Sequence, residues 1–302
     1  MNLAFIVNPA SGKGLTAFKR FKKKLTIPYR TYITHYPKHA TKIIQHLLDE
    51  GLINVVIVVG GDGTIHEVIN GMKQHQLVLG VIRNGSGNDF GRHFHTFKTA
   101  RQLETFMKRK PKTVKADLGV YQSTKQQRLF INNSGIGFDA AVCQSINQST
   151  HKTYLNRLKL GKLIYIYHVF KTLRTFEPFD LKLMTEDHEA SFTNVWFLTA
   201  SNQPFFGGGM KIAPQANGHD GTLTITIVQH LKRRSFLYLF WLVYKGAHTR
   251  NAAVSQMQVK QLTVQTGNNQ VAHADGETYY ITRHTPVHYQ IQPKKIQLAK
   301  KT

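Results

Sequence analysis

Three glycine-rich loops in the first third of the sequence each follow a short apolar run. They occupy positions 8–14 (NPASGKG), 60–64 (GGDGT) and 84–90 (NGSGNDF). If the preceding runs form parallel strands, the loops gather at the carboxyl edge of one sheet, where ligands bind. Exposed backbone N–H groups and helix N-termini at that edge favour phosphate. Any one loop could be a tight turn, but the three together predict a site for a phosphate-bearing ligand.

Two common nucleotide motifs are absent from these loops. A Walker A loop needs Gly, four residues and then Gly-Lys-Ser/Thr, but Gly14 follows Lys13 and Val7 holds the leading position. A dinucleotide fingerprint that began at Gly61 would require glycine where the sequence has His66. These departures exclude a P-loop NTPase and a standard nicotinamide-cofactor Rossmann domain.

Alternating strand and helix patterns must position the loops. In the first 120 residues we predict strands at Leu3–Val7, Tyr29–Thr34, Asn54–Val59 and Leu77–Ile82, and helices at Leu15–Leu25, His39–Glu50 and Ile65–Met72. This alternation is typical of a parallel sheet with right-handed crossovers.

The pattern changes at about residue 128. Alternating apolar and polar residues, typical of half-buried antiparallel strands, occur at Leu129–Asn132, Asn194–Ala200, Leu223–Val228, Val259–Gln265, Thr278–Thr282 and Val287–Ile291. Helical patches near 153–175 and 233–247 interrupt them. A chain of 302 residues also favours two domains, so the second half is expected to form a mainly β domain.

Further motifs occur in a characteristic order along the chain. They are Asn8-Pro9-x-Ser11-Gly12, Gly60-Gly61-Asp62-Gly63-Thr64 with Glu67-Val68-Ile69-Asn70-Gly71, the 85–90 loop, Ala116-Asp117-Leu118-Gly119, Asn132-Ser134-Gly135-Gly137-Asp139, Gly207-Gly208-Gly209-Met210 with Ala213-Pro214, Asp220-Gly221-x-Leu223 and Asp275-Gly276-Glu277. With them the sequence resembles the diacylglycerol kinase catalytic domain family, in particular bacterial soluble lipid kinases, from residue 3 to about 292. The Gly-Gly-Asp-Gly-Thr loop alone also occurs in NAD kinases and phosphofructokinases.

The resemblance implies a two-domain α/β plus β fold and a chemical activity. The expected domains are a Rossmann-like nucleotide-binding α/β domain over 1–127 plus 286–302, and an antiparallel β-sandwich lipid-substrate domain over 128–285. The implied activity is an ATP- and Mg²⁺-dependent lipid kinase that phosphorylates diacylglycerol, or a related lipid, to phosphatidic acid.

The resemblance also implies which residues bind ATP. The expected contacts are Asn8, Pro9, Ala10, Ser11, Gly12, Thr34, Gly60, Gly61, Asp62, Gly63, Thr64, Ile65, His66, Glu67, Ser86 and Asn88. The chain departs from the family at two positions: His39 replaces an Asp, and Ser86 replaces a Thr. The hydroxyl survives at Ser86. His39 is expected to be a surface residue, with contact to a phosphate as the alternative.

Two metal sites are expected. Carboxylates beside a triphosphate are costly unless a cation lies between them, so Asp62, Asp89 and Asp117 are expected to hold the ATP-linked Mg²⁺, largely through water. The alternative is that each caps a helix or turn, which suits Asp117 better than Asp62. The resemblance implies a second, structural Mg²⁺ site at Asn217, Asp220 and Thr222, where an Asp-Gly turn is the alternative.

Asp275-Gly276-Glu277 is the candidate for proton transfer. A hydroxyl acceptor must lose its proton as it attacks, and a nearby carboxylate can take it. Either Asp275 or Glu277 is expected to be the base, with the other orienting it or the substrate. The alternative is a plain β-turn, because Asp-Gly is a common turn pair.

The charge balance points to polyanionic partners. The chain has 40 Lys and Arg against 16 Asp and Glu, a formal net charge of +24. Basic residues beside aromatic ones near 153–175 and 233–247 suit an anionic membrane surface, although both helices could instead pack on the sheet with solvated charges. The apolar run Phe236–Tyr244 is far shorter than the roughly 20 residues that span a bilayer. We expect a cytoplasmic protein, peripheral at the inner face of the membrane, with a homodimer left open.

Two other kinds of protein share part of these features. An NAD kinase would share the Gly-Gly-Asp-Gly-Thr loop but would not explain Gly-Asn-Asp-Phe at 87–90 or the late Asp-Gly-Glu. A basic nucleic-acid-binding protein would explain the charge but not the loops, and no RNA-recognition or helix-turn-helix signature stands out. No nucleic-acid partner is therefore expected.

Overall fold

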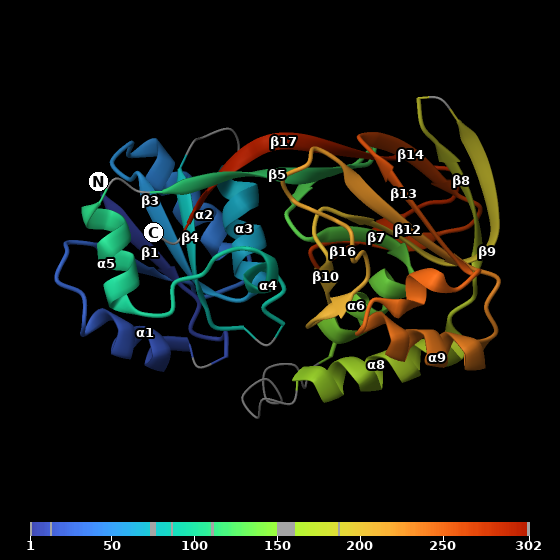
Figure 1. The fold of residues 1–302 in the computed structure, drawn as a ribbon, viewed down its shortest axis with the longest axis horizontal. Coiled ribbons are helices and arrows are strands. Elements are labelled where there is room, and N and C mark those ends of the chain that lie inside the picture. The colour runs from blue at the N-terminus through green and yellow to red at the C-terminus, as the bar shows by residue number, and fades with distance from the viewer. Residues whose placement is uncertain are drawn as a thin grey trace. The chain divides into compact units, whose positions relative to one another are not determined.

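The computed structural model describes residues 2–12, 14–72, 77–85, 87–109, 112–149, 161–186 and 188–300, and Figure 1 shows its fold. Internal contacts divide the chain into two compact units. Unit 1 includes Met1–Ala116 and Lys294–Thr302, and unit 2 includes Asp117–Lys152 and Leu160–Pro293. The unit boundaries fall inside the two long strands β5 (Thr113–Gln122) and β17 (Val287–Ala299), each of which contributes residues to both units.

Unit 1 contains the expected parallel sheet. Its strands are β1 (Leu3–Val7), β2 (Arg30–Ile33), β3 (Val55–Gly60) and β4 (Val78–Arg83), in the order β2-β1-β3-β4, with the end of β17 parallel to β4. Every residue of β1 and β3 is buried, which explains their uninterrupted apolar runs. The helices of unit 1 are α1 (Gly14–Lys22), α2 (His39–Asp49), α3 (Asp62–Met72), α4 (Phe90–His93) and α5 (Ala100–Lys108).

Apolar side chains from strands and helices close the core of unit 1. Phe5 and Ile57 from the sheet share one buried cluster with Phe18 of α1 and Phe106 of α5. Helices α2 and α3 pack tightly against each other, since a Cβ built at Gly71 would lie 2.3 Å from the Cγ2 of Ile44. This packing holds α3, and the loop at its N-terminus, in place.

Unit 2 is mainly antiparallel β-structure, which confirms the predicted α/β plus β fold. Its strands besides β5 and β17 are β6 (Gln127–Phe130), β7 (Asn133–Gly137), β8 (Phe179–Met184), β9 (Glu189–Ser201), β10 (Phe205–Phe206), β11 (Met210–Lys211), β12 (Leu223–Gln229), β13 (Val254–Val259), β14 (Gln261–Thr266), β15 (Gln270–Ala274) and β16 (Glu277–Ile281). The pairing runs β16-β15-β7-β9-β8-β14-β17, and β12 joins β9 to β13.

Helices accompany these strands. They are α6 (Phe138–Asn147), α8 (Gly161–Thr175), α9 (Arg233–Val243) and the short 3-10 helix η1 (Ala247–Arg250). The predicted helix near 233–247 corresponds to α9 and η1. Of the helix predicted near 153–175, the part from 161 onward forms α8, and residues 153–160 lie outside the described residues. Among the described helices, none is long and apolar enough to cross a membrane.

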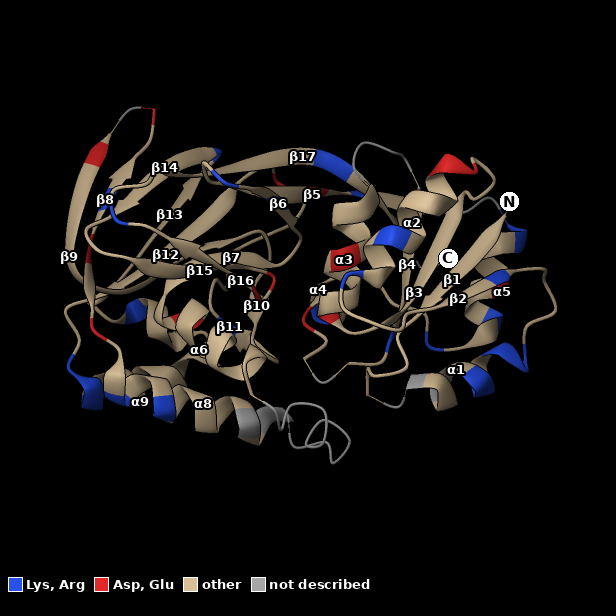
Figure 2. Cartoon of the chain, turned by 180° about the vertical axis from the view of Figure 1, so that it is seen from behind, with Lys and Arg blue, Asp and Glu red and all other residues tan. Residues whose placement is uncertain are grey.

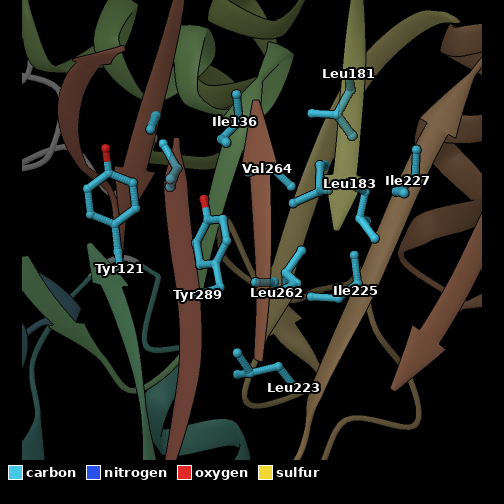
Figure 3. Packing of buried hydrophobic residues seen from close by; sticks show 14 of the residues in the cluster. Tyr121, Ile136, Leu181, Leu183, Leu223, Ile225, Ile227, Leu262, Val264 and Tyr289 are labelled. Atoms are coloured by element: carbon cyan, nitrogen blue, oxygen red, sulfur yellow. The ribbon is translucent and has the colours of Figure 1, made fainter. Parts of the chain in front are cut away.

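Two layers of apolar contacts stabilise unit 2. In Figure 3 the side chains of Ile136, Leu181, Leu262 and Ile225 project from different strands into one cluster. A second cluster lies between the sheet and helices α6, α8 and α9, and Trp196 is at its centre, 1% exposed. The second cluster fixes the buried faces of the three helices.

Candidate active site

The three glycine loops of unit 1 meet at the carboxyl edge of its sheet. A Cβ built at Gly85 would lie 2.5 Å from the Cα of Gly61, and one at Gly12 would lie 2.3 Å from the carbonyl oxygen of Asn84. The Oγ of Ser11 donates to that same carbonyl at 2.7 Å. The loops after β1, β3 and β4 are therefore in direct backbone contact, which side chains at these glycines would prevent.

Asn8 links the first loop to the second. Its side-chain amide donates to the Oγ1 of Thr64 at 2.9 Å, and its Oδ1 accepts from the backbone N–H of Ala10 at 2.9 Å. Thr64 lies in the first turn of α3, whose first N–H groups have no partner within the helix. A Cβ built at Gly63 would meet nothing within 4 Å. The start of α3 thus combines a positive helix end with room for a ligand.

Asp62 serves as a cap, a role that was expected more readily of Asp117. Its Oδ2 accepts from the backbone N–H of Asp89 at 3.2 Å and its Oδ1 from that of Phe90 at 3.0 Å. The Asp89 carboxylate lies 3.4 Å from the Nε of Arg92. The structure therefore brings Asp62 and Asp89 together beside the second and third loops.

Three other residues of unit 1 that were expected to bind nucleotide make hydrogen bonds within the fold. Thr34 follows β2, is buried, and donates its N–H to the carbonyl of Val7 at 2.9 Å. Asn88 closes the third loop through its side chain, which accepts from the N–H of Gly85 at 3.0 Å. The Glu67 carboxylate accepts from the N–H of Ala40 at 3.1 Å, so it caps α2. These three residues hold loops and helices in position.

Ile65, His66 and Ser86 were also expected to contact ATP, and His39 was expected at the surface. The side chains of Ile65 and His66 are buried in the packing of α3, with 2% and 3% exposure. Ser86 lies outside the described residues. His39, expected at the surface, is half-buried; its ring stacks on that of Tyr36 and its Nδ1 accepts from the N–H of His35.

Asp117 lies inside β5 and belongs to unit 2, whereas the nucleotide-binding domain was expected to extend to residue 127. It is fully buried, and its Oδ2 accepts from the N–H of Gly221 at 2.8 Å. Its own N–H donates to the carbonyl of Gly218. Asp117 therefore anchors the loop that carries the second set of expected metal ligands.

That loop, from Asn217 to Thr222, is closed by its own hydrogen bonds. The Oδ1 of Asp220 accepts from both the N–H and the hydroxyl of Thr222, and the carbonyl of Asn217 accepts from the N–H of His219 at 2.7 Å. Within the described ranges no group of three or more His, Cys, Asp or Glu side chains lies in position to hold a metal ion.

Asp275 sits in a strained turn that fixes its carboxylate. Its φ is 47°, in the left-handed region. Oδ1 accepts from the N–H groups of Asn132 and Asn133, and Oδ2 from that of Ile131, at 2.9, 3.1 and 2.9 Å. Three charge-assisted hydrogen bonds from one strand connection hold this group rigidly. Glu277, two residues later, is exposed at the start of β16.

A buried Asp139–His273 pair supports this turn. The Nε2 of His273 lies 3.2 Å from the Oδ2 of Asp139, and its Nδ1 accepts from the N–H of Gly276 at 3.3 Å. Phe206 stacks on the imidazole, and Thr199 donates to Asp139 at 2.8 Å. Asp139 was singled out only within a motif and His273 was not predicted, because 134 residues separate the partners. The one local signal was a histidine two residues before the Asp-Gly-Glu run.

A narrow apolar pocket lies in unit 2, beneath α8 and α9. Its lining residues are Phe138, Asp139, Tyr165, Val169, Phe197, Thr199, Phe206, Met210, Ile212, Val228, Phe236, Leu239, Phe240, Val243 and His248. The cavity volume is about 40 Å³. Apart from Asp139, Thr199 and His248 its walls are apolar or aromatic, as in pockets for hydrophobic ligands.

His248 makes the pocket sensitive to acid. Burial lowers its pKa, against the opposing effect of the hydrogen bond that its Nε2 makes to the carbonyl of Ile212 at 3.0 Å. Its Nδ1 has no hydrogen-bond partner in the described part of the chain. The folded protein therefore disfavours the protonated imidazole.

We expect acid to destabilise the protein through His248. Below the ordinary histidine pKa of about 6.5 the unfolded chain takes up a proton that the folded one rejects, so stability is complete above that pH and is lost below it. Each such proton lowers the free energy of unfolding by up to about 1.4 kcal/mol per pH unit. Melting temperatures of His248→Gln should decline less between pH 7 and 5 than those of the wild type. The exposed His188→Gln serves as control, and an unchanged decline in His248→Gln would contradict the assignment.

Comparisons with family models assign each half of the chain to a known domain type. The diacylglycerol kinase catalytic domain matches residues 2–119. The YegS C-terminal NAD kinase beta sandwich-like domain matches residues 133–300. The two matches are consecutive and follow the change from parallel to antiparallel sheet.

Individual relatives agree with the family models. A Bacillus subtilis (strain 168) protein named "Putative lipid kinase YtlR" is 36% identical over 287 residues, which cover 90% of this chain and 92% of that protein. A Mycobacterium tuberculosis (strain ATCC 25618 / H37Rv) diacylglycerol kinase is 28% identical over 237 residues, 77% of this chain and 74% of the relative. A crystal structure from Bacillus anthracis str. Sterne, described as "a putative diacylglycerol kinase", superposes with a TM-score of 0.75 at 21% identity, covering 99% and 97% of the two chains. That likeness shows the fold.

Proposed function

Since this chain belongs to the diacylglycerol kinase catalytic domain family, a family of lipid kinases, we propose that it transfers the γ-phosphate of ATP to a hydroxyl of a membrane lipid. Diacylglycerol is the first candidate and phosphatidic acid its product. Relatives named as diacylglycerol kinases support this choice. A lipid acceptor confines the reaction to a membrane surface, so the proposed location is the cytoplasmic face of the membrane.

The observation that carries the proposal is the backbone contact of three glycine loops at one sheet edge. Gly61 and Gly85 approach each other closely while the space beside Gly63 is open. Phosphoryl transfer depends mostly on positioning and on neutralising the charge of the γ-phosphate. Backbone N–H groups and the N-terminus of α3 supply donors for a triphosphate there.

Asp62 and Asp89 fit the requirements of an ATP-linked Mg²⁺. Magnesium usually keeps several waters and binds one or two carboxylates together with substrate phosphates. The Asp62 carboxylate lies between the second and third loops, where its two oxygens accept from the N–H groups of Asp89 and Phe90. When bound, the ion would neutralise charge on the phosphates. In this proposal Asp117 and Asp220 maintain the 217–222 loop.

We assign proton acceptance to Asp275. The lipid hydroxyl oxygen attacks the γ-phosphorus, its proton passes to the Asp275 carboxylate, and the bond to the bridging β–γ oxygen breaks to release ADP. Three backbone N–H groups hold the Asp275 carboxylate in one orientation, so that a substrate hydroxyl can be positioned against it. Glu277 is exposed and is assigned to orienting the lipid head group.

The apolar pocket of unit 2 is the proposed site for an acyl chain. At about 40 Å³ it is narrow, so a chain requires α8 and α9 to separate slightly from the sheet. Those two helices are joined to the sheet chiefly by apolar side chains, which can rearrange more readily than paired strands. Asp139 and Thr199 line the same pocket.

Filling the pocket should impair lipid turnover selectively. Val169→Phe inserts a ring from α8 into the pocket, and we expect kcat/KM for long-chain acceptors to fall at least tenfold. Val142→Phe, in the same buried cluster but not in the pocket lining, is the matched control for overpacking, which costs about 1–3 kcal/mol of stability. Equal losses of turnover in the two variants would count against the pocket.

Incubation with labelled ATP tests the function as a whole. The purified chain is assayed with diacylglycerol, monoacylglycerol, ceramide and a sphingoid base in mixed micelles, and with NAD as control. Labelled phosphatidic acid is the expected product. Transfer to NAD, or to none of the lipids, would overturn the proposal.

A further inference from the structure

The outer faces of α8 and α9 share one unusual pattern. On α9 the exposed residues Arg234, Tyr238, Trp241 and Lys245 recur at intervals of four, three and four, which places them on one face of the helix and its extension. The side chains of Tyr238 and Trp241 are 65% and 56% exposed. The solvent-exposed face of a helix in a soluble protein is normally polar.

Helix α8 repeats this arrangement. Its exposed residues Leu163, Tyr167, Phe170, Lys171 and Arg174 fall on one face, and the first three are 61%, 63% and 43% exposed. Together the two helices carry five of the nine exposed large hydrophobic side chains among the described residues. Patches of this kind mark interaction surfaces.

The two faces belong to one surface. The guanidinium of Arg233 on α9 donates to the carbonyls of Leu173 and Phe176 at the end of α8, at 3.0 and 2.9 Å. The rings of Tyr165 and Phe240 stack between the helices at 6.5 Å. Because the opposite faces of both helices pack in the cluster around Trp196, the exposed stripes both point away from the sheet.

The charged residues of α8 and α9 indicate which kind of partner this surface binds. Neither helix contains Asp or Glu, and Figure 2 shows blue segments and no red along both of them. Aromatic side chains among cations, without acids, match the interface of an anionic bilayer, where rings lie at the head-group level and Lys and Arg pair with lipid phosphates.

We propose that the outer face of α8 and α9 is the surface by which the protein docks on an anionic bilayer, inserting Leu163, Tyr167, Phe170, Tyr238 and Trp241 between the head groups. The inference rests on the proposed lipid substrate and deepens it, because the inner faces of the same helices line the apolar pocket through Tyr165, Val169, Leu239 and Phe240. A lipid chain then passes from the bilayer to the pocket alongside the helices.

Vesicle sedimentation without ATP tests the surface separately from catalysis. The full chain is mixed with vesicles of phosphatidylcholine containing 0 or 30% phosphatidylglycerol, at low and high salt. We expect binding that requires the anionic lipid and weakens with salt. Tyr238→Ser with Trp241→Ser should weaken binding at least tenfold, whereas Tyr238→Phe with Trp241→Phe should retain it. Arg234→Gln with Lys245→Gln should cost about fivefold per charge.

Matched controls remove a tyrosine and two lysines that lie outside α8 and α9. Tyr280→Ser takes away a side chain that is 74% exposed on β16, and Lys125→Gln with Lys260→Gln removes two charges from strand-connecting turns. These variants should bind vesicles like the wild type. Unchanged binding in the α9 variants, or equal losses in the controls, would overturn the docking surface. A wild-type dimer by light scattering that becomes a monomer in Tyr238→Ser with Trp241→Ser would assign the face to a second copy instead.

The outcome is independent of the proposed reaction. If the wild type phosphorylates no lipid in mixed micelles yet the α9 variants lose vesicle binding, the function fails and the surface stands. If lipid is phosphorylated and the variants bind vesicles normally, the surface fails and the function stands.

Discussion

Asp275→Asn is expected to lower lipid phosphorylation by about 10²–10⁴-fold, the usual contribution of a general base. The substitution removes the group that accepts the hydroxyl proton. It also turns an amide N–H₂ toward the donors that now bind Asp275, since Ile131, Asn132 and Asn133 all direct backbone N–H groups at its two oxygens. Initial rates with labelled ATP and diacylglycerol in mixed micelles measure the effect.

The matched variant is Glu277→Gln, two residues further on. Glu277 is exposed, with no side-chain hydrogen bond among the described residues, so its replacement should raise KM for the lipid and change kcat by less than about tenfold. ATP binding, measured by fluorescence titration, should remain at the wild-type level in both variants. Wild-type kcat in Asp275→Asn, or a larger loss in Glu277→Gln than in Asp275→Asn, would transfer the role to Glu277.

Gly85→Ala is expected to weaken ATP binding about 100-fold. The new Cβ would lie 2.5 Å from the Cα of Gly61, a backbone atom that cannot move aside as the end of a flexible side chain can. The second and third loops must therefore separate, and the N–H groups that converge on the phosphates lose their alignment. A hundredfold loss corresponds to about 2.7 kcal/mol of binding free energy. Titration calorimetry with a non-hydrolysable ATP analogue measures it.

Substitutions at two other glycines distinguish two causes of weaker ATP binding. One is crowding between the loops, and the other is a side chain that occupies the ligand site. Gly63→Ala meets nothing within 4 Å and lies in the first turn of α3, where alanine favours helix. It should keep or raise the melting temperature while weakening ATP binding, because its methyl group enters the space assigned to phosphate. Gly267→Ala in unit 2 makes only an ordinary contact at 3.4 Å and should leave ATP binding unchanged. Wild-type affinity in both Gly85→Ala and Gly63→Ala would exclude these loops as the nucleotide site.

Local patterns predicted most of unit 1 because burial on both faces imposes a strong constraint. The run that forms β3 is entirely buried, so every position must be apolar and the strand is visible without any partner. β5 shows the opposite case. Its first residues, Thr113, Val114 and Lys115, are exposed or half-buried, which leaves little periodicity to detect, and no strand was predicted there.

The candidate site divides in the same way between local and distant information. Glycine, Asp and Asn at fixed spacings predicted the loops, because turns and close approaches between backbone segments restrict the residue type at each position. The contact of Gly61 with Gly85 and the cap that Asp62 provides for Phe90 depend on how neighbouring strands align. Neither has a signature within one segment.

The sequence by itself determined the order of parallel and antiparallel halves, the three loops and the acidic candidates, since each follows from short-range preferences of a few adjacent residues. Only the tertiary structure decided which groups act together. It joined His273 to Asp139 across 134 residues and directed three backbone N–H groups at Asp275. It also placed exposed aromatic side chains on the outer faces of α8 and α9. The reason is physical: such pairings are selected by the packing of the whole chain, and the energies that select them belong to contacts between distant segments.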